Sequence, residues 1–189
     1  TLKTKLPQLN VRVVRSPNIP IIGVGEATTT VLPRHFFEYL KMKPQMFYAE
    51  AKPTYKMGIR FLWGPRKDFV YTFSYEFEKR HPQCSRNNGF YYSDEMPWLG
   101  YSSAFMLHDK VFPRRPDGLP QFHNNHAFHL ENVTYVGWLE NRCRDRGVVV
   151  TDATVKAEVG GEGIAALVTD AGERITGDLY LDASGFRSE

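Results

Sequence analysis

The sequence predicts an α/β fold with mixed sheets. Short runs that are β-branched, or that alternate aromatic with other residues, are typical of strands, and one longer segment has apolar residues at helical spacing. The chain of 189 residues is 42% hydrophobic, 14% aromatic and only 24% charged. This composition is typical of a folded protein with a buried core and excludes a disordered chain.

The first elements are expected to be a strand, a glycine loop and a helix. Residues 11–14 are mostly valine and lie between prolines, which favours a strand. Gly23 and Gly25 then give the backbone freedom, and the threonines at 28–30 are expected to cap a helix over residues 31–40. Glycine N–H groups and a helix N-terminus suit a phosphate or the edge of an electron-rich ring, and an ordinary turn is the alternative.

The middle of the chain is expected to contain two aromatic-rich strands within residues 55–77, where bulky residues alternate with others. Residues 78–124 contain five prolines and weak periodicity, which predicts an irregular excursion that covers another part of the domain. Its many aromatic residues would either wall a pocket for a planar substrate or belong to the core.

The last part is expected to begin with a helix over residues 125–146 that ends at Gly147. Residues 148–182 then predict an antiparallel meander, broken at the glycine-rich positions 160–163 and 170–173. An apolar strand at 179–181 is expected to close the fold.

Charge and cysteine content argue against several classes of protein. The formal net charge is +3 without a run of one sign, so neither nucleic acid nor a membrane surface is an expected partner. Cys84 and Cys143 have no metal-type spacing, and no apolar stretch is long enough to span a membrane, which favours the cytoplasm. The histidines at 123, 126 and 129 recur every three residues but lack further ligands at suitable spacing, so no metal site is expected.

Four segments point together to one family: IPIIGVGEATT at 19–29, TYKMGIRFLW at 54–63, ENRCRDRGV at 140–148 and LYLDASGFRS at 179–188. In order and spacing they resemble the flavin-dependent tryptophan halogenases. The resemblance implies a flavin-monooxygenase-like FAD-binding fold, present here as a partial chain, and an enzyme that halogenates a small aromatic substrate.

The resemblance also implies the chemistry. A separate flavin reductase supplies FAD as FADH2, and with O2 and chloride or bromide the family makes hypohalous acid, which travels to the substrate. Lys56 matches the active-site lysine. An amine in an apolar setting has a lowered pKa, and it either forms a haloamine or holds hypohalous acid by a hydrogen bond. A flavin-dependent aromatic hydroxylase and a non-catalytic flavin-fold binding domain are the alternatives.

The resemblance assigns cofactor contacts to three places. The loop that lines the isoalloxazine and halide side matches Gly23, Val24, Gly25, Glu26 and Ala27. The element that approaches the ribityl chain and pyrophosphate matches Asp182 and Gly185. Val155 matches a backbone contact to adenine, with an ordinary strand valine as the alternative.

The sequence also departs from the family pattern. The N-terminal glycine turn and the C-terminal part of the family are not contained in residues 1–189, so we expect a partial FAD-binding domain that is incomplete for catalysis. Arg15 stands where an acidic residue normally binds the ribose, which leaves FAD or a 2′-phosphate of NADP open. In the substrate pocket, Tyr71 replaces the histidine of tryptophan-specific members and Phe73 keeps the aromatic flank, which puts free tryptophan in doubt.

Overall fold

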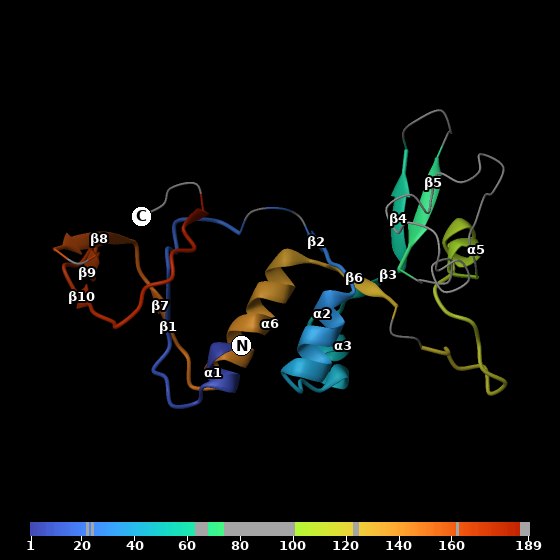
Figure 1. Ribbon diagram of the computed structural model, residues 1–189, viewed down its shortest axis with the longest axis horizontal. Helices are drawn as coiled ribbons and strands as arrows, with labels where there is room; N and C mark the ends of the chain where they lie inside the picture. Colours follow the sequence, from blue (N-terminus) through green and yellow to red (C-terminus); the bar gives the residue numbers. More distant parts are fainter. Residues whose placement is uncertain are drawn as a thin grey trace, which may run out of the picture. The chain divides into compact units, whose positions relative to one another are not determined.

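The chain contains both helices and strands, and the strands form parallel and antiparallel pairs, which confirms the predicted α/β class with mixed sheets (Figure 1). The computed structural model describes residues 1–21, 23, 25–62, 68–73, 101–122, 125–161 and 163–185. It divides into two compact units: unit 1 comprises Thr1–Ile22 with Val136–Glu189, and unit 2 comprises Gly23–Tyr135.

A parallel strand pair and the short helix α1 (Leu2–Lys5) belong to unit 1. Strand β1 (Arg12–Arg15) confirms the strand expected at 11–14, shifted by one residue. It pairs in parallel with β7 (Val149–Asp152), so that Arg15 lies opposite Asp152 at the carboxyl ends of the strands. The sequence placed β7 in an antiparallel meander, which is wrong, because its partner comes from the distant N-terminal part of the chain.

The rest of the expected meander is confirmed. Strands β8 (Val155–Gly160), β9 (Gly163–Thr169) and β10 (Arg174–Ile175) form an antiparallel sheet in the order β10-β9-β8. The turns lie at the glycine-rich positions that predicted them, and Gly172 has a φ of 82°, a conformation that favours glycine.

The strand expected at 179–181 is not formed. Leu179 and Leu181 are 77% and 72% exposed, and no strand pairs with this segment in the part of the chain that the structure describes. The Tyr180 hydroxyl instead donates to the Ala165 carbonyl at 3.3 Å and accepts from the Gly177 N–H at 2.8 Å. An apolar pattern becomes a strand only where a neighbour satisfies the backbone groups.

Three short helices follow the glycine loop of unit 2. The helix expected at 31–40 is present as α2 (Val31–Pro33) and the π-helix η1 (Arg34–Tyr39), in which the Leu40 N–H donates to the His35 carbonyl. Thr30 occupies the N-cap position but makes no side-chain capping bond, so the capping role expected of the threonines is wrong. Helix α3 (Pro44–Glu50) was not predicted, although Pro44 in its first turn is a helix signal.

Two small sheets follow. Strands β2 (Glu26–Ala27), β6 (Ala127–Leu130) and β3 (Thr54–Lys56) form an antiparallel sheet with β6 in the centre, and β4 (Gly58–Phe61) pairs with β5 (Phe69–Thr72) as a hairpin. The aromatic strands expected within 55–77 are therefore present, as three strands instead of two; residues 74–77 lie outside the described ranges.

The helix expected at 125–146 begins later, because its first part is strand β6. Helix α6 spans Asn132–Arg144, and the Glu131 carboxylate caps it by accepting from the N–H groups of Val133 at 2.9 Å and Thr134 at 2.8 Å. β6 bonds to a strand on each side, and this pairing overrides the helical spacing. The predicted stop is confirmed, since Gly147 has a φ of 73°.

The excursion expected at 78–124 is regular in one place. Residues 78–100 lie outside the described ranges, whereas Tyr101–Leu107 form helix α5 and Arg114 bridges to Pro120 across a turn. The core of unit 2 is rich in rings, and Phe47 and Phe128 at its centre are fully buried. None of the helices in the described ranges is long and apolar enough to cross a membrane.

Candidate functional site

Lys56, the last residue of β3, meets two groups that hold its ammonium. Its Nζ donates to the carbonyl oxygen of Thr28 at 3.0 Å and lies 5.4 Å from the centre of the Phe73 ring. The side chain is half-buried, and this burial lowers the pKa of the Lys56 amine. The structure thus brings together three parts of unit 2: the segment after the glycine loop, β3 and the end of the β4–β5 hairpin.

Thr28 continues β2 along the central strand β6. Its N–H donates to the Phe128 carbonyl at 2.9 Å, while its hydroxyl accepts from the Phe128 N–H at 2.9 Å and donates to the same carbonyl at 3.2 Å. The sequence predicts a helix cap at Thr28 and gives no sign of this role. The three adjacent threonines carry no signal that separates one from another.

Phe73 follows the β4–β5 hairpin, and the substrate-pocket residue Tyr71 lies within it. The Phe73 N–H donates to the Met57 carbonyl at 2.9 Å, and Tyr71 pairs with Ile59 across the hairpin. The strands approach closely at Gly58, where a Cβ would lie 2.2 Å from the Tyr71 carbonyl oxygen. This glycine therefore lets the hairpin bring the Phe73 ring, which is nearly buried, to Lys56.

The glycine loop is exposed at each of its described residues, Gly23, Gly25, Glu26 and Ala27, whereas Val24 lies outside the described ranges. Gly23 has a φ of 89°, and a Cβ on Gly25 would lie 2.8 Å from the Leu130 carbonyl oxygen. The loop backbone is thereby fixed against β6 on one side. Because positions 23, 25 and 27 carry at most a methyl group, its backbone stays accessible to a flat ligand, and the residues fit an isoalloxazine ring.

The other predicted cofactor residues belong to unit 1. Val155 begins β8 and pairs with Thr169. The Asp182 carboxylate accepts from the Ser184 N–H at 2.8 Å, and hydrogen bonds from Ser184 lower the pKa of Asp182. Gly185 has a φ of 73°, in a turn that exposes its backbone. Acceptors, donors and open backbone of this kind fit a polar chain of hydroxyls and phosphates.

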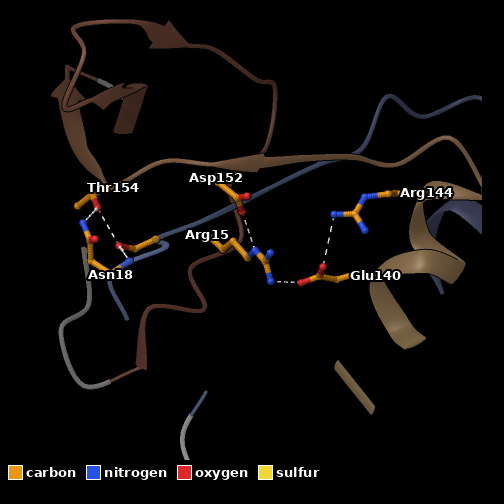
Figure 2. A network of polar contacts seen from close by, with 7 residues as sticks. Arg15, Asn18, Glu140, Arg144, Asp152 and Thr154 are labelled. Carbon is orange, nitrogen blue, oxygen red and sulfur yellow. Dashed lines mark hydrogen bonds and ion pairs between the residues drawn. The ribbon is translucent and has the colours of Figure 1, made fainter. Parts of the chain in front are cut away.

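Arg15 lies between two carboxylates at the carboxyl end of β1 (Figure 2). Its Nε donates to Asp152 at 2.7 Å and its Nη1 pairs with Glu140, which also meets Arg144 at 3.4 Å. The hydrogen bond to Asp152 and the charge of Glu140 raise the pKa of Arg15. A 2′-phosphate would have to compete with both carboxylates, so the arrangement disfavours the NADP alternative.

The two described histidines of this segment, His126 and His129, do not lie on a helix, because residues 127–130 form strand β6. His126 is buried against the rings of Tyr55 and Phe128, whereas His129 in β6 is exposed, and His123 lies outside the described ranges. Within the part of the chain that is described, no three histidine, cysteine, aspartate or glutamate side chains are placed to hold a metal ion.

Comparison with known proteins gives one consistent result. A family model described as tryptophan halogenase matches residues 1–189. The chain is 28% identical to the tryptophan 6-halogenase SttH of Streptomyces toxytricini, over 95% of this chain and 39% of the relative. It is 31% identical to the 7-chloro-L-tryptophan 6-halogenase KtzR of Kutzneria sp. (strain 744), over 95% of this chain and 40% of the relative.

Solved structures agree with this result. MibH, described as a lathipeptide tryptophan 5-halogenase, has a TM-score of 0.77 at 33% identity, over 98% of this chain and 36% of its own. Xcc4156, a flavin-dependent halogenase from Xanthomonas campestris, has a TM-score of 0.70 at 28% identity, over 98% of this chain and 39% of its own. The chain thus spans about 40% of the length of the curated relatives it matches.

Proposed function

The chain belongs to the tryptophan halogenase family, and we propose on this premise that it is part of a flavin-dependent enzyme that halogenates an aromatic substrate. The observation that carries the proposal is the Lys56 amine, held 3.0 Å from the Thr28 carbonyl and beside the Phe73 ring. It combines a family motif with a geometry that fits the chemistry. Residues 1–189 then form a partial FAD-binding halogenase domain.

The residues of this chain would hold FAD in three places. The loop of Gly23, Val24, Gly25, Glu26 and Ala27 would line the isoalloxazine and the halide, Asp182 and Gly185 would bind the ribityl chain and pyrophosphate, and Val155 would contact adenine. When bound as FADH2 from a separate flavin reductase, the cofactor would supply with O2 the oxidising equivalents that turn chloride or bromide into hypohalous acid.

Lys56 would act on the hypohalous acid. In its protonated form the amine donates a hydrogen bond to the acid, and in its neutral form it attacks the halogen, which makes a haloamine and releases water. Burial lowers the pKa of Lys56, so the neutral amine forms at a lower pH than it does for an exposed lysine. The Thr28 carbonyl and the Phe73 ring keep the amine in one place in either case.

A small aromatic compound is the proposed substrate. Tyr71 lies on the β4–β5 hairpin and Phe73 directly follows it, so the two place aromatic rings close together, and Tyr71 also brings a phenol where tryptophan-specific members have a histidine. The names of the relatives differ in the form of tryptophan that they specify, so no single one transfers to this chain. The free thiol of Cys143 suits a reducing cytoplasm, the location we propose.

The test uses the full-length protein with FAD, a flavin reductase, NADH, chloride or bromide, and a panel of indoles and phenols. We expect halogenated product by mass spectrometry. Lys56→Ala should lower its rate by about 100-fold or more while FADH2 oxidation continues, because the lost group acts after the flavin step. Lys110→Ala, which removes an exposed lysine of the same unit, is the matched control.

Other outcomes separate the alternatives. Hydroxylated product without incorporated halogen would support the aromatic hydroxylase and contradict halogenation. Unchanged halogenation in Lys56→Ala would remove the role of the lysine. If the full-length protein neither binds FAD in a fluorescence titration nor makes product, the non-catalytic flavin-fold domain is favoured.

A further inference from the structure

We propose that Thr28 is a positioning residue that ties the Lys56 amine to the glycine loop through the central strand β6. The inference rests on the proposed role of Lys56 in halogenation and adds a residue to it. It arises from the contacts of Thr28, whose carbonyl accepts from Lys56 while its hydroxyl and N–H bond to Phe128.

The register of the sheet explains why the lysine reaches this carbonyl. β2 and β3 lie on opposite sides of β6, so their backbones are about 10 Å apart, twice the usual spacing of neighbouring strands. Lys56 pairs with Ala127, and cross-strand partners share a face of the sheet. The long stem of Lys56 therefore crosses β6 at Ala127, the residue directly opposite it, whose side chain is only a methyl group.

Thr28 is fixed from the protein interior. The three hydrogen bonds of its N–H and hydroxyl all join it to Phe128, which is fully buried and packs against the rings of Phe47 and Tyr55. These bonds restrict the motion of the Thr28 backbone, so its carbonyl stays in one position. The acceptor that positions the Lys56 amine is thus anchored to the core of unit 2 through Phe128.

The same strand also fixes the loop. Glu26 and Ala27 pair with Leu130 and His129 of β6, directly before Thr28. The loop backbone and the Lys56 acceptor are consequently parts of one short strand on one partner. Thr28 sets the position of the amine relative to the loop, so a change at Thr28 alters the amine without removing any group from the loop itself.

Thr28→Val tests this role because it keeps the shape of the side chain and removes both hydroxyl hydrogen bonds to Phe128. Thr28→Ser keeps the hydroxyl, and Thr29→Val makes the same change at an exposed neighbour. The first readout needs no flavin: acetic anhydride labels the lysines of the full-length protein, and mass spectrometry compares Lys56 with Lys110. The second is the ratio of halogenated product to FADH2 oxidised.

In Thr28→Val, acetic anhydride should label Lys56 about fivefold faster, the factor that corresponds to one typical hydrogen bond. The ratio of halogenated product to FADH2 oxidised should fall. Thr28→Ser and Thr29→Val should match the unchanged protein in both readouts. Unchanged labelling in a folded Thr28→Val overturns the proposal. Faster labelling in a protein that never halogenates supports the role of Thr28 and contradicts the proposed function instead.

A measurement on the unchanged protein guards against a variant that fails to fold. Hydrogen bonding to Thr28 should slow proton exchange at the Lys56 ammonium, which then gives its own ¹⁵N NMR signal, identified by its loss in Lys56→Arg. Exchange as fast as at Lys110 would show that no such bond holds the amine and would overturn the proposal.

Discussion

Two cations, one in each unit, have opposite surroundings. Lys56 is half-buried and meets a neutral carbonyl and an aromatic ring, and in the part of the chain that is described it forms no ion pair. Arg15 is exposed and meets the carboxylates of Asp152 and Glu140. Burial lowers the pKa of the lysine, whereas its acidic partners raise that of the arginine.

The difference separates a cation suited to chemistry from one suited to structure. A nearby carboxylate would stabilise the ammonium of Lys56 and raise its pKa, which would hinder proton exchange or attack on a halogen. Arg15 needs no reactivity and links two strands and a helix of its own unit. We therefore expect changes of side-chain shape to have the largest effects around Lys56, and changes of charge to have the largest effects around Arg15.

Replacing Gly58 by alanine should have the largest effect on this comparison. The added Cβ would lie 2.2 Å from the Tyr71 carbonyl oxygen and 2.7 Å from the Thr72 Cα, so the backbones of β4 and β5 must separate. We expect a loss of roughly 3 kcal/mol in the free energy of unfolding, measured with chemical denaturant. The Phe73 ring should move away, and Lys56 should become easier to acetylate.

Gly137→Ala is the control for this change. Gly137 lies within α6, and no atom lies within 4 Å of the Cβ that it would acquire. Helix propensity predicts a gain of about 0.5–1 kcal/mol there. Equal stabilities for the two alanine variants would refute the view that close strand approach positions Phe73.

The residues around Lys56 also show which parts of the candidate site the sequence predicts and which it does not. The motif at 54–63 locates the lysine, and the alternation of aromatic residues locates its strands, because both signals are local. The roles of Thr28 and Phe128 were missed, since a hydrogen bond across 100 residues leaves no local pattern. β6 was misassigned for a related reason: its helical spacing continues into α6, and only its two partner strands decide otherwise.

In unit 1 the same limit applies to strand partners. The hairpin of β8 and β9 was predicted well because glycines mark its turn. β7 begins with two valines and residues 179–181 are apolar throughout, yet only β7 has a partner among the described residues. Local pattern gives the tendency to form a strand, and a distant segment decides whether the strand exists.

The next largest effect is expected at high pH, which should lower the stability of the ring-rich core of unit 2. Burial raises the pKa of Tyr48 and of Tyr135 to about 12, from an ordinary value of 10.0. Between these values the unfolded chain loses protons that the native protein keeps, so the free energy of unfolding should fall as the pH rises from 10.0 to about 12. Denaturant titrations at several pH values measure this slope.

Tyr48→Phe should reduce that slope, because it removes one of the phenols whose pKa burial raises. The ultraviolet difference spectrum of tyrosinate gives an independent check, in which Tyr48 and Tyr135 should ionise late. If every tyrosine ionises near its ordinary pKa in the folded protein, burial does not control charge in this unit, and the contrast between Lys56 and Arg15 loses its basis.

The smallest effect is expected at Arg15. Arg15→Met keeps the stem and removes the charge shared by Asp152 and Glu140, which should lower the melting temperature by about 1–3 °C at low salt. Arg12→Met, on the same strand, is the matched control, because Arg12 forms no ion pair with the described residues.

Salt distinguishes charge from packing at this site. At about 1 M salt the Debye length falls to about 3 Å, so the difference between Arg15→Met and the unchanged protein should vanish. The corresponding difference for Gly58→Ala should persist, since a steric clash is not screened. If Arg15→Met lowers the melting temperature equally at low and high salt, the arginine stabilises unit 1 by packing and not by charge. The contrast between Arg15 and Lys56 would then be smaller than their partner groups suggest.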